Sequence, residues 1–553
     1  MGTGGQRGRP HRVARQVLAR QGWSAQQDRV AWLLRVNRLY GPNERWVRGS
    51  GFADAFQGGC WPERTSVYRI SRWETAAVRV PYLAVRRYEE LLQLPANRLV
   101  ALLDAIYRYS AATDSGAPLL DRNLRDGDPH QVARLEELVE AVRSEEIVTG
   151  SDWDELTAYL AFSPRQVITP RSAWSDIAER LLAEMIVADG VAWMQRYEAL
   201  NRMLAHPVGQ QHAVAACASL AADRTNQVFV EIVSALDASP HPDASRHVLD
   251  QLVHPTNDRA QYGALLACVR KLRYGHFSEP QTRRLVSVVN ELALDPARYE
   301  DAQPLATELL RRLPADVPAS AKARLRHLVA GDPTLSQVLA AGRLAAAEAG
   351  DVLVARMTNT TLANMPRDVP SFRDELLPTL LDEMLFNPVF DVRLHAAILL
   401  FGTPYRRPVA TALALELNSH AASFSVDVAH AMIEALRILG DDRQRPFIER
   451  LTTATGVSPS ITVAATQAIG HIGGYSDDNY WKKALTHHAD RWHRTGNKAS
   501  ASALNALIYG LGMARNTPLL DQVRNHHLAP AMARAAASWW LNLQRSVYES
   551  ASR

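Results

Sequence analysis

Cysteine is scarce in this 553-residue chain, which has only Cys60, Cys217 and Cys268. Three scattered cysteines do not make the disulfide framework of a small secreted domain, so the chain fits a reducing compartment. Long apolar runs are missing as well. No stretch approaches the roughly 18 uncharged apolar residues of a membrane span, and the N-terminus lacks the apolar segment of a signal peptide. We therefore expect a cytoplasmic protein with no membrane partner.

Lysine is also rare, and it occurs at only five positions: Lys271, Lys322, Lys482, Lys483 and Lys498. The excess of arginine over lysine and the abundance of alanine suggest a high-G+C bacterial genome. Runs of alternating β-branched residues are missing too, which argues against strands. Residues 132–148, 152–161 and 174–188 instead show helical periodicity, with Pro and Gly between the segments. We predict an all-α fold that is too long for one compact domain.

Motifs of enzymatic chemistry are absent from the sequence. There is no Gly-x-x-x-x-Gly-Lys phosphate loop, and no strand precedes a Gly-x-Gly-x-x-Gly turn. His487, His488, Asp490 and His493 have a spacing that could hold a metal on a helix. No cysteine joins them, and the neighbouring Lys482–Lys483 pair disfavours a cation. We predict no catalytic residue, no metal and no cofactor.

Residues 65–77 are the most informative segment of the chain. If they form a helix, one side of it carries Val67, Ile70, Trp73, Glu74 and Ala77. The opposite side carries Tyr68, Arg72 and Thr75. Such a helix suits the major groove of DNA, where arginine can form two hydrogen bonds to guanine. We expect Thr65 or Ser66 to cap its start. An ordinary amphipathic helix with a solvated basic face is the alternative.

Residues 70–74 read Ile-Ser-Arg-Trp-Glu, and the next expected helix carries Tyr88, Glu89, Leu92 and Leu94. These residues match the Ile-Ser-x-x-Glu core and the Tyr-Glu-x-x-Leu-x-Leu segment of the λ-repressor-like (XRE) family. Residues 65–94 therefore resemble the second half of a helix-turn-helix domain. The resemblance implies a regulator that binds double-stranded DNA, and such proteins usually bind as homodimers.

The sequence departs from the family pattern before the recognition helix. Earlier helices are expected at residues 25–39, with Ser24 as the cap, and at residues 50–56. The connection that follows, QGGCWPER, is about twice as long as the usual turn of this motif. We therefore expect an insertion here, or a longer or shifted second helix.

Positive charge is concentrated in residues 1–110, which contain eighteen arginines, no lysine and eight acids, a net charge of 18 − 8 = +10. The whole chain carries +4, so residues 111–553 sum to 4 − 10 = −6. Clustered positive charge attracts nucleic-acid phosphates without regard to sequence. Residues 1–23 read as a Gly-rich basic arm. Its Arg7, Arg9 and Arg12 are expected to bind DNA, with a merely soluble terminus as the equal alternative.

The helix-turn-helix reading assigns further roles. Two residues are expected to reach base edges: Tyr68 and Arg72. Three are expected to contribute at the edges of the contact with the bases: Val67, Arg69 and Thr75. Four are expected to contact phosphates: Arg48, Arg64, Ser66 and Arg79. Three hold the helix in its domain without touching DNA: Ile70, Trp73 and Glu74.

Beyond residue 110 the chain divides into three predicted regions. Residues 111–130 read as a linker, residues 131–380 as a helical region and residues 381–553 as HEAT-like helical repeats. Similar segments begin at Asp391, Asp427, Ile461 and Ser502. Their aligned positions Val392, Val428, Val463 and Ser502 are 36, 35 and 39 residues apart, spacings typical of stacked helical hairpins. A non-repetitive bundle of Ala-rich helices is the alternative.

Three functions compete on the sequence alone. The favoured one is a sequence-specific transcriptional regulator at the nucleoid, whose helical body dimerises or senses a protein or small ligand. The second is a helical-repeat interaction scaffold in which the helix-turn-helix does not read DNA sequence. The third, an all-α enzyme with an unrecognised site, has no motif in its favour.

Overall fold

The computed structural model describes residues 22–110, 120–122, 124–125, 127–144, 146–165, 168–294, 302–312, 327, 329, 331–420 and 425–553. Within these ranges the chain is helical and has no β-strand, only an isolated antiparallel bridge between Gly58 and Trp61. The predicted all-α fold class is therefore confirmed. No helix in the described part of the chain has the length and apolar character needed to cross a membrane.

The first group of helices spans residues 22–110. It comprises α1 (Gly22–Leu39), η1 (Glu44–Val47), α2 (Gly49–Phe56), α3 (Val67–Trp73), α4 (Tyr82–Leu92) and α5 (Arg98–Ser110). The helix expected at residues 25–39 begins earlier, so Ser24 lies inside it and is not its cap. The second helix agrees with the expected 50–56 to within one residue.

Helix α3 is shorter than the helix predicted at residues 65–77. It begins at Val67 because the Ser66 hydroxyl accepts a hydrogen bond from the backbone N–H of Arg69 at 3.2 Å, so Ser66 and not Thr65 is the cap. It ends at Trp73, and Ala76 has a φ of 56°, the left-handed conformation that stops a helix. Ala77 is therefore outside the helix and exposed.

The middle of the chain forms a second group of helices. It comprises α6 (Pro129–Arg143), α7 (Gly150–Phe162), α8 (Ala173–Met185), α9 (Gly190–Ala205), α10 (Gly209–Ala222), α11 (Val230–Ser234), η2 (Ala235–Ala238), α12 (Pro242–Val253), α13 (Asp258–Tyr274), α14 (Glu279–Leu294), α15 (Ala302–Arg312), α17 (Pro333–Ala341), α18 (Ala347–Ala363) and α19 (Leu376–Phe386). The helix expected at 132–148 is displaced toward the N-terminus, because Asp128 caps it and Pro129 occupies its first turn.

The remaining helices are α20 (Phe390–Phe401), α21 (Arg406–His420), α22 (Val426–Leu439), α23 (Arg445–Thr452), α24 (Pro459–Ala468), α25 (Asp478–Thr495), α26 (Lys498–Met513), α27 (Thr517–Asn525), α28 (Ala531–Leu541) and α29 (Arg545–Ser550). The four similar segments of the sequence fall on α20, α22, α24 and α26. Each of these helices packs on the next one in the series and also on the helix that precedes it in the chain. The HEAT-like likeness itself stays a prediction.

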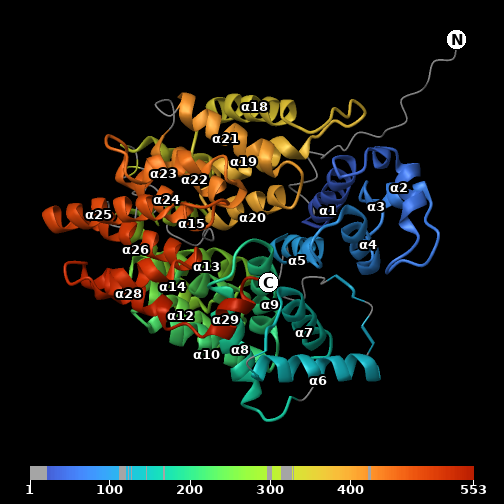
Figure 1. Ribbon diagram of the computed structural model, residues 1–553, viewed down its shortest axis with the longest axis horizontal. Helices are drawn as coiled ribbons and strands as arrows, with labels where there is room; N and C mark the ends of the chain where they lie inside the picture. Colours follow the sequence, from blue (N-terminus) through green and yellow to red (C-terminus); the bar gives the residue numbers. More distant parts are fainter. Residues whose placement is uncertain are drawn as a thin grey trace.

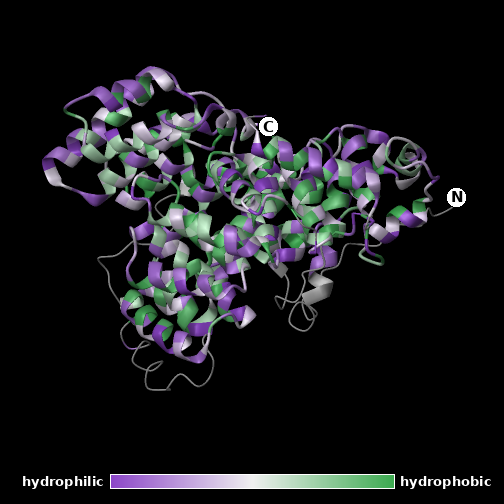
Figure 2. Ribbon diagram, turned by 90° about the horizontal axis from the view of Figure 1, so that it is seen from below, coloured by the Kyte–Doolittle hydropathy of each residue, from purple (hydrophilic) through white to green (hydrophobic). Residues whose placement is uncertain are grey.

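Helices α1–α4 lie together at one end of the molecule, and α25 and α28 lie at the other (Figure 1). Hydrophobic stretches of the helices face one another inside, and hydrophilic stretches lie outward (Figure 2). Helix α5 packs on α1 and α4 on one side and on α9 and α20 on the other. The first group of helices therefore shares its core with the rest of the chain.

Polar contacts join the first group to distant helices. The Trp32 indole donates to Asp374 at 2.9 Å, and the Tyr405 hydroxyl donates to the same carboxylate at 2.8 Å. The Asn37 amide donates to the Gly402 carbonyl at 3.0 Å. These contacts fix α1 against the segments around α19–α21.

Part of the predicted linker is also packed. Leu120 is buried, and the Arg122 guanidinium pairs with Asp104 of α5 and Asp154 of α7. Arg202 of α9 binds the same two carboxylates at 2.5 and 2.8 Å. Residues 129–130, at the end of the predicted linker, already belong to α6. Leu120 and the Arg122 side chain are thus interior and residues 129–130 are helical, whereas Asp121, Arg125 and Gly127 are exposed.

Candidate nucleic-acid interface

A buried ion pair fixes the inner side of α3. The Glu74 carboxylate accepts hydrogen bonds from Nε and Nη2 of Arg38 at 2.7 and 2.6 Å, and from the Tyr88 hydroxyl at 2.9 Å. Arg38 also donates to the Trp46 carbonyl at 2.5 Å. One carboxylate therefore ties the end of α3 to α1 and α4, and its charge is matched by a cation as a buried charge requires.

An aromatic cluster packs beneath the same side of α3. The Trp73 ring lies 5.7 Å from Phe56 and 5.8 Å from Trp61, centroid to centroid. Trp61 reaches this position because Gly58 and Trp61 pair through their backbones and turn the chain inward. The connection between α2 and α3 is therefore long because it contains Trp61, whose ring packs in the core.

The residues of α4 that resemble the Tyr-Glu-x-x-Leu-x-Leu segment also have structural roles. Tyr88 and Leu92 are buried, and the Glu89 carboxylate accepts hydrogen bonds from the backbone N–H groups of Asn97, Leu99 and Val100 at the start of α5. Burial raises the pKa of Glu89 to about 7, although Arg86 and the three N–H groups act in the opposite direction. Glu89 thus joins α4 to α5.

The outer side of α3 presents Tyr68 and Arg72. Tyr68 is 71% exposed, Arg72 is also exposed, and its guanidinium lies 5.6 Å from the centre of the Tyr68 ring. This placement agrees with the predicted outward side. Val67 departs from its predicted inward side, because it is 45% exposed at the first position of the helix.

Three other predicted contact residues are partly engaged within the protein. The Arg69 guanidinium lies 4.9 Å from the Trp61 ring centre and 3.4 Å from Glu63. The Thr75 hydroxyl donates to the Ser71 carbonyl at 2.7 Å. The Arg79 guanidinium lies 5.0 Å from the centre of the Tyr107 ring. These side chains are half-buried, whereas Arg48 and Arg64 are exposed.

A groove of about 640 Å³ runs beside α3. Four of the predicted site residues line it: Tyr68, Arg69, Arg72 and Arg79. Sequence reasoning missed its other wall, which consists of Val78, Val80, Pro81 and Asp121. No local sequence pattern marks these residues. Asp121, for example, belongs to the predicted linker and is placed at the groove only by the tertiary structure. The predicted phosphate contacts Arg48, Arg64 and Ser66 do not line the groove.

The charge of the first group is smaller at the surface than its composition implies. Residues 22–110 hold thirteen arginines and eight acids, or 13 − 8 = +5. Several of these arginines point inward, each to a carboxylate: Arg29 to Glu383, Arg38 to Glu74 and Arg108 to Glu198. The remaining arginines of residues 1–110 lie in residues 1–21, which are outside the described part of the chain, and Arg7, Arg9 and Arg12 are among them.

The histidine-rich segment of α25 is held by backbone carbonyls. Nε2 of His488 lies 2.8 Å from the Thr452 carbonyl oxygen, and Nε2 of His493 lies 3.0 Å from that of Leu528. In the described part of the chain, no three His, Cys, Asp or Glu side chains gather closely enough to hold a metal ion.

Comparison with known proteins adds no assignment. No protein-family model matches the chain, and no curated protein matches it.

Proposed function

We propose that this protein is a sequence-specific DNA-binding regulator and that α3 enters the major groove. The observation that carries the proposal is the division of α3 into two sides. Tyr68 and Arg72 project outward from a helix whose inner side is fixed by the Glu74–Arg38 ion pair. A side chain that reads bases must be held by a rigid element, and this ion pair supplies the rigidity.

The dimensions of α3 agree with this role. An α-helix is about 10–12 Å across with its side chains and so enters a major groove about 12 Å wide, and the seven residues of α3 extend about 10 Å along its axis. Arg72 is proposed to donate two hydrogen bonds to guanine, and Tyr68 to contact the neighbouring base. Val67, Arg69 and Thr75 are proposed to contribute at the edges of the contact.

Phosphate contacts are proposed to come from residues around α3. Arg48 lies before α2 and Arg64 in the connection to α3, and both are exposed. Ser66 and Arg79 are proposed to join them, together with Arg7, Arg9 and Arg12 of the basic arm. Such contacts set the register of the protein on the duplex and make its affinity depend on salt.

We further propose that the protein binds as a homodimer at the nucleoid. Two copies would place their α3 helices on half-sites about one helical turn apart. The helical body would supply the dimer contact or sense a protein or small ligand. A palindromic binding site would support the dimer.

The test is binding of the purified full chain to random genomic duplex fragments over a range of salt, with sequencing of the retained DNA. We expect enrichment of one motif, and loss of that enrichment in Arg72→Ala and Tyr68→Ala. The matched control is Tyr475→Ala, because Tyr475 is 75% exposed and lies near the far end of the chain. The control should bind as the wild type does.

Phosphate contacts are distinguished by their salt dependence. Arg64→Ala should weaken binding to all sequences alike and reduce the slope of log K against log[salt] by about one. Binding without a motif, or equal binding by Arg72→Ala and the wild type, would contradict sequence reading. The alternative, a helical-repeat interaction scaffold, would then be favoured.

A further inference from the structure

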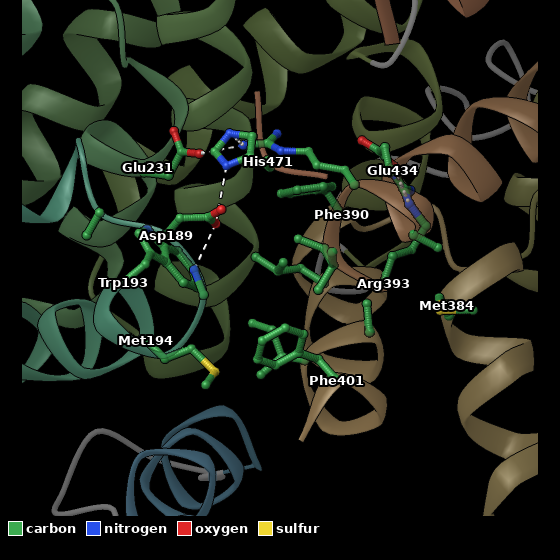
Figure 3. A pocket seen from close by; sticks show the side chains of 18 of the residues that line it. Asp189, Trp193, Met194, Glu231, Met384, Phe390, Arg393, Phe401, Glu434 and His471 are labelled. Carbon is green, nitrogen blue, oxygen red and sulfur yellow. Dashed lines mark hydrogen bonds and ion pairs between the residues drawn. The ribbon is translucent and has the colours of Figure 1, made fainter. Parts of the chain in front are cut away.

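A second cavity lies far from α3, where the middle helices meet the last group. It measures about 340 Å³, within the usual range of small-molecule sites of about 300–1,000 Å³. Its walls come from the residues before α9 and the start of that helix, from α11, α19, α20, α21, α22 and α26, and from the residues after α24. Figure 3 shows its apolar side chains, among them Trp193, Met194, Phe390 and Phe401.

Asp189 lies at one side of this cavity, at the cap of α9. Its Oδ1 accepts hydrogen bonds from the backbone N–H of Gly190 at 2.8 Å and from the His471 ring at 3.3 Å. Its side chain lines the cavity and is 49% exposed, so part of its surface faces the open space. Among the described residues, no hydrogen-bond donor is placed on Oδ2.

The charge of His471 follows from its two neighbours. Nε2 lies 2.8 Å from Nη2 of Arg437, and a guanidinium can only donate, so Nε2 is the acceptor. Nδ1 therefore carries the proton that it donates to Asp189. Burial and Arg437 lower the pKa of His471, so the ring is neutral. The hydrogen bond orients Asp189 but does not neutralise it.

The cations that line the cavity make their hydrogen bonds and ion pairs with groups other than Asp189, although Arg437 and Arg406 lie near enough to interact with its charge. Arg393 donates to Glu434 at 2.7 and 3.1 Å. Arg437 faces His471 and lies 3.9 Å from Glu231. Arg406 donates to the carbonyls of Leu439 and Gly440 at 3.1 and 3.2 Å, at the negative end of α22.

Asp189 is therefore a charged carboxylate with neutral hydrogen-bond donors on one oxygen and open space at the other. Desolvation raises the pKa of Asp189, but the hydrogen bonds from His471 and from the Gly190 N–H, together with the nearby Arg437, outweigh it and lower the pKa, so the carboxylate is ionised at neutral pH. Because part of its side-chain surface is open to the cavity, a cation that enters the cavity can reach this charge. Trp193 follows it by one helical turn, so an aromatic ring and the carboxylate border the same space.

We propose that this cavity binds a small organic cation with an apolar body, its protonated nitrogen on Asp189 and its body among Trp193, Met194 and Phe401. The apolar walls would exclude water from the body of the ligand, and the carboxylate would select for positive charge. This binding site does not depend on DNA binding, and either activity can fail without the other.

The experiment is isothermal titration of the full chain with tryptamine, a protonated amine on an indole. N-acetyltryptamine and indole-3-propionate are matched probes, because they keep the indole and replace the cation by a neutral and a negative group. We expect binding of tryptamine alone. Asp189→Asn should weaken tryptamine binding about tenfold or more, the usual effect of losing a hydrogen bond to a charged group.

Asn caps helices as well as Asp does, so Asp189→Asn should keep α9 intact, and its melting temperature without ligand verifies this. The matched control is Asp128→Asn, because Asp128 caps α6 in the same way at the surface. It should bind tryptamine as the wild type does. Equal binding of all three probes, no binding of tryptamine, or an unchanged affinity in Asp189→Asn would each overturn the proposal.

Discussion

Neighbouring residues of α3 have opposite surroundings. Trp73 is 3% exposed and contacts Phe56 and Trp61, whereas Arg72 is exposed and touches Tyr68 of its own helix. Removal of a packed ring leaves a cavity, but removal of a solvated guanidinium leaves the core unchanged. The two substitutions should therefore separate stability from DNA binding.

We expect Trp73→Ala to lower the free energy of unfolding by about 3–5 kcal/mol, as is usual for a large buried aromatic residue. Arg72→Ala should change it by less than about 0.5 kcal/mol. Urea titrations followed by circular dichroism measure both values. Equal destabilisation by the two variants would refute this assignment of the sides of α3.

His395 is buried beside cations. Its ring stacks on Tyr109 with 4.7 Å between centroids, and its Nε2 has no hydrogen-bond partner. Burial, together with Arg29, Arg108 and Arg270, lowers its pKa well below the usual 6.5. The folded state therefore binds this proton less readily than the unfolded state, whose histidine titrates near 6.5. The contribution of His395 to stability is present above pH 6.5 and is lost as the pH falls.

His395→Phe should remove this part of the acid sensitivity while keeping the stacked ring. Below pH 6.5, its stability relative to the wild type should rise by up to about 1.4 kcal/mol for each pH unit. Denaturation at pH 7.5 and at pH 5.5 gives the comparison. The exposed ring of His527 supplies the control, since His527→Phe should leave the pH dependence as it is.

At the scale of elements, helices approach one another closely where small residues lie between them. Gly263 of α13 faces α11, and a Cβ added to it would lie 2.8 Å from the Val230 carbonyl oxygen and 3.1 Å from its Cα. Both neighbours are backbone atoms, so they cannot move aside as a flexible side chain would. Glycine is needed here to let the two helices pack.

Gly263→Ala should therefore destabilise the protein by about 1–3 kcal/mol, the usual cost of overpacking a core. The thermal melting temperature and a urea titration measure the loss. Gly331→Ala is the matched control, because a Cβ there would meet nothing within 4 Å. If both variants had wild-type stability, the close approach of α11 and α13 would be wrong.

At the scale of the whole molecule, the first group of helices depends on the body for its core. Trp32, Leu102 and Tyr107 are almost completely buried, and α5 packs on both α9 and α20. The Leu102 side chain lies so close to Gly402 that a Cβ there would be 2.3 Å from Leu102 Cδ1. The DNA-binding segment proposed here is thus one surface of a larger core.

A fragment of residues 22–110 should consequently not fold independently. We expect it to lack a cooperative thermal transition by circular dichroism, because Trp32 and Leu102 would be exposed to water. The full chain should melt cooperatively under the same conditions. A sharp transition in the fragment would show that this segment is an autonomous domain.

The continuity of the core also bears on regulation. Phe401 lines the proposed ligand cavity, and its backbone carbonyl accepts a hydrogen bond from Arg98 of α5 at 2.7 Å. If both proposals hold, a ligand in the cavity and DNA on α3 act on one continuous body. Any change that one makes in the affinity for the other must then be reciprocal.

The all-α class, most helix positions in the first group and the outward placement of Tyr68 and Arg72 are predictable from the sequence. These features depend on periodicity and capping within a few residues of the chain, which are local properties. The shorter length of α3 is not predictable from the sequence. Thr65 and Ser66 are both acceptable caps, and Ala76 adopts a conformation that alanine rarely takes.

Which arginines face solvent depends on contacts between segments that are far apart in the sequence. Arg29, Arg38 and Arg108 look like surface charges in a basic segment, yet distant acids turn each of them inward. The ligand cavity also depends on distant segments, because Asp189 and His471 are separated by 282 residues. Contacts of this kind depend on how whole helices pack, because a buried charge needs a partner that no local pattern identifies.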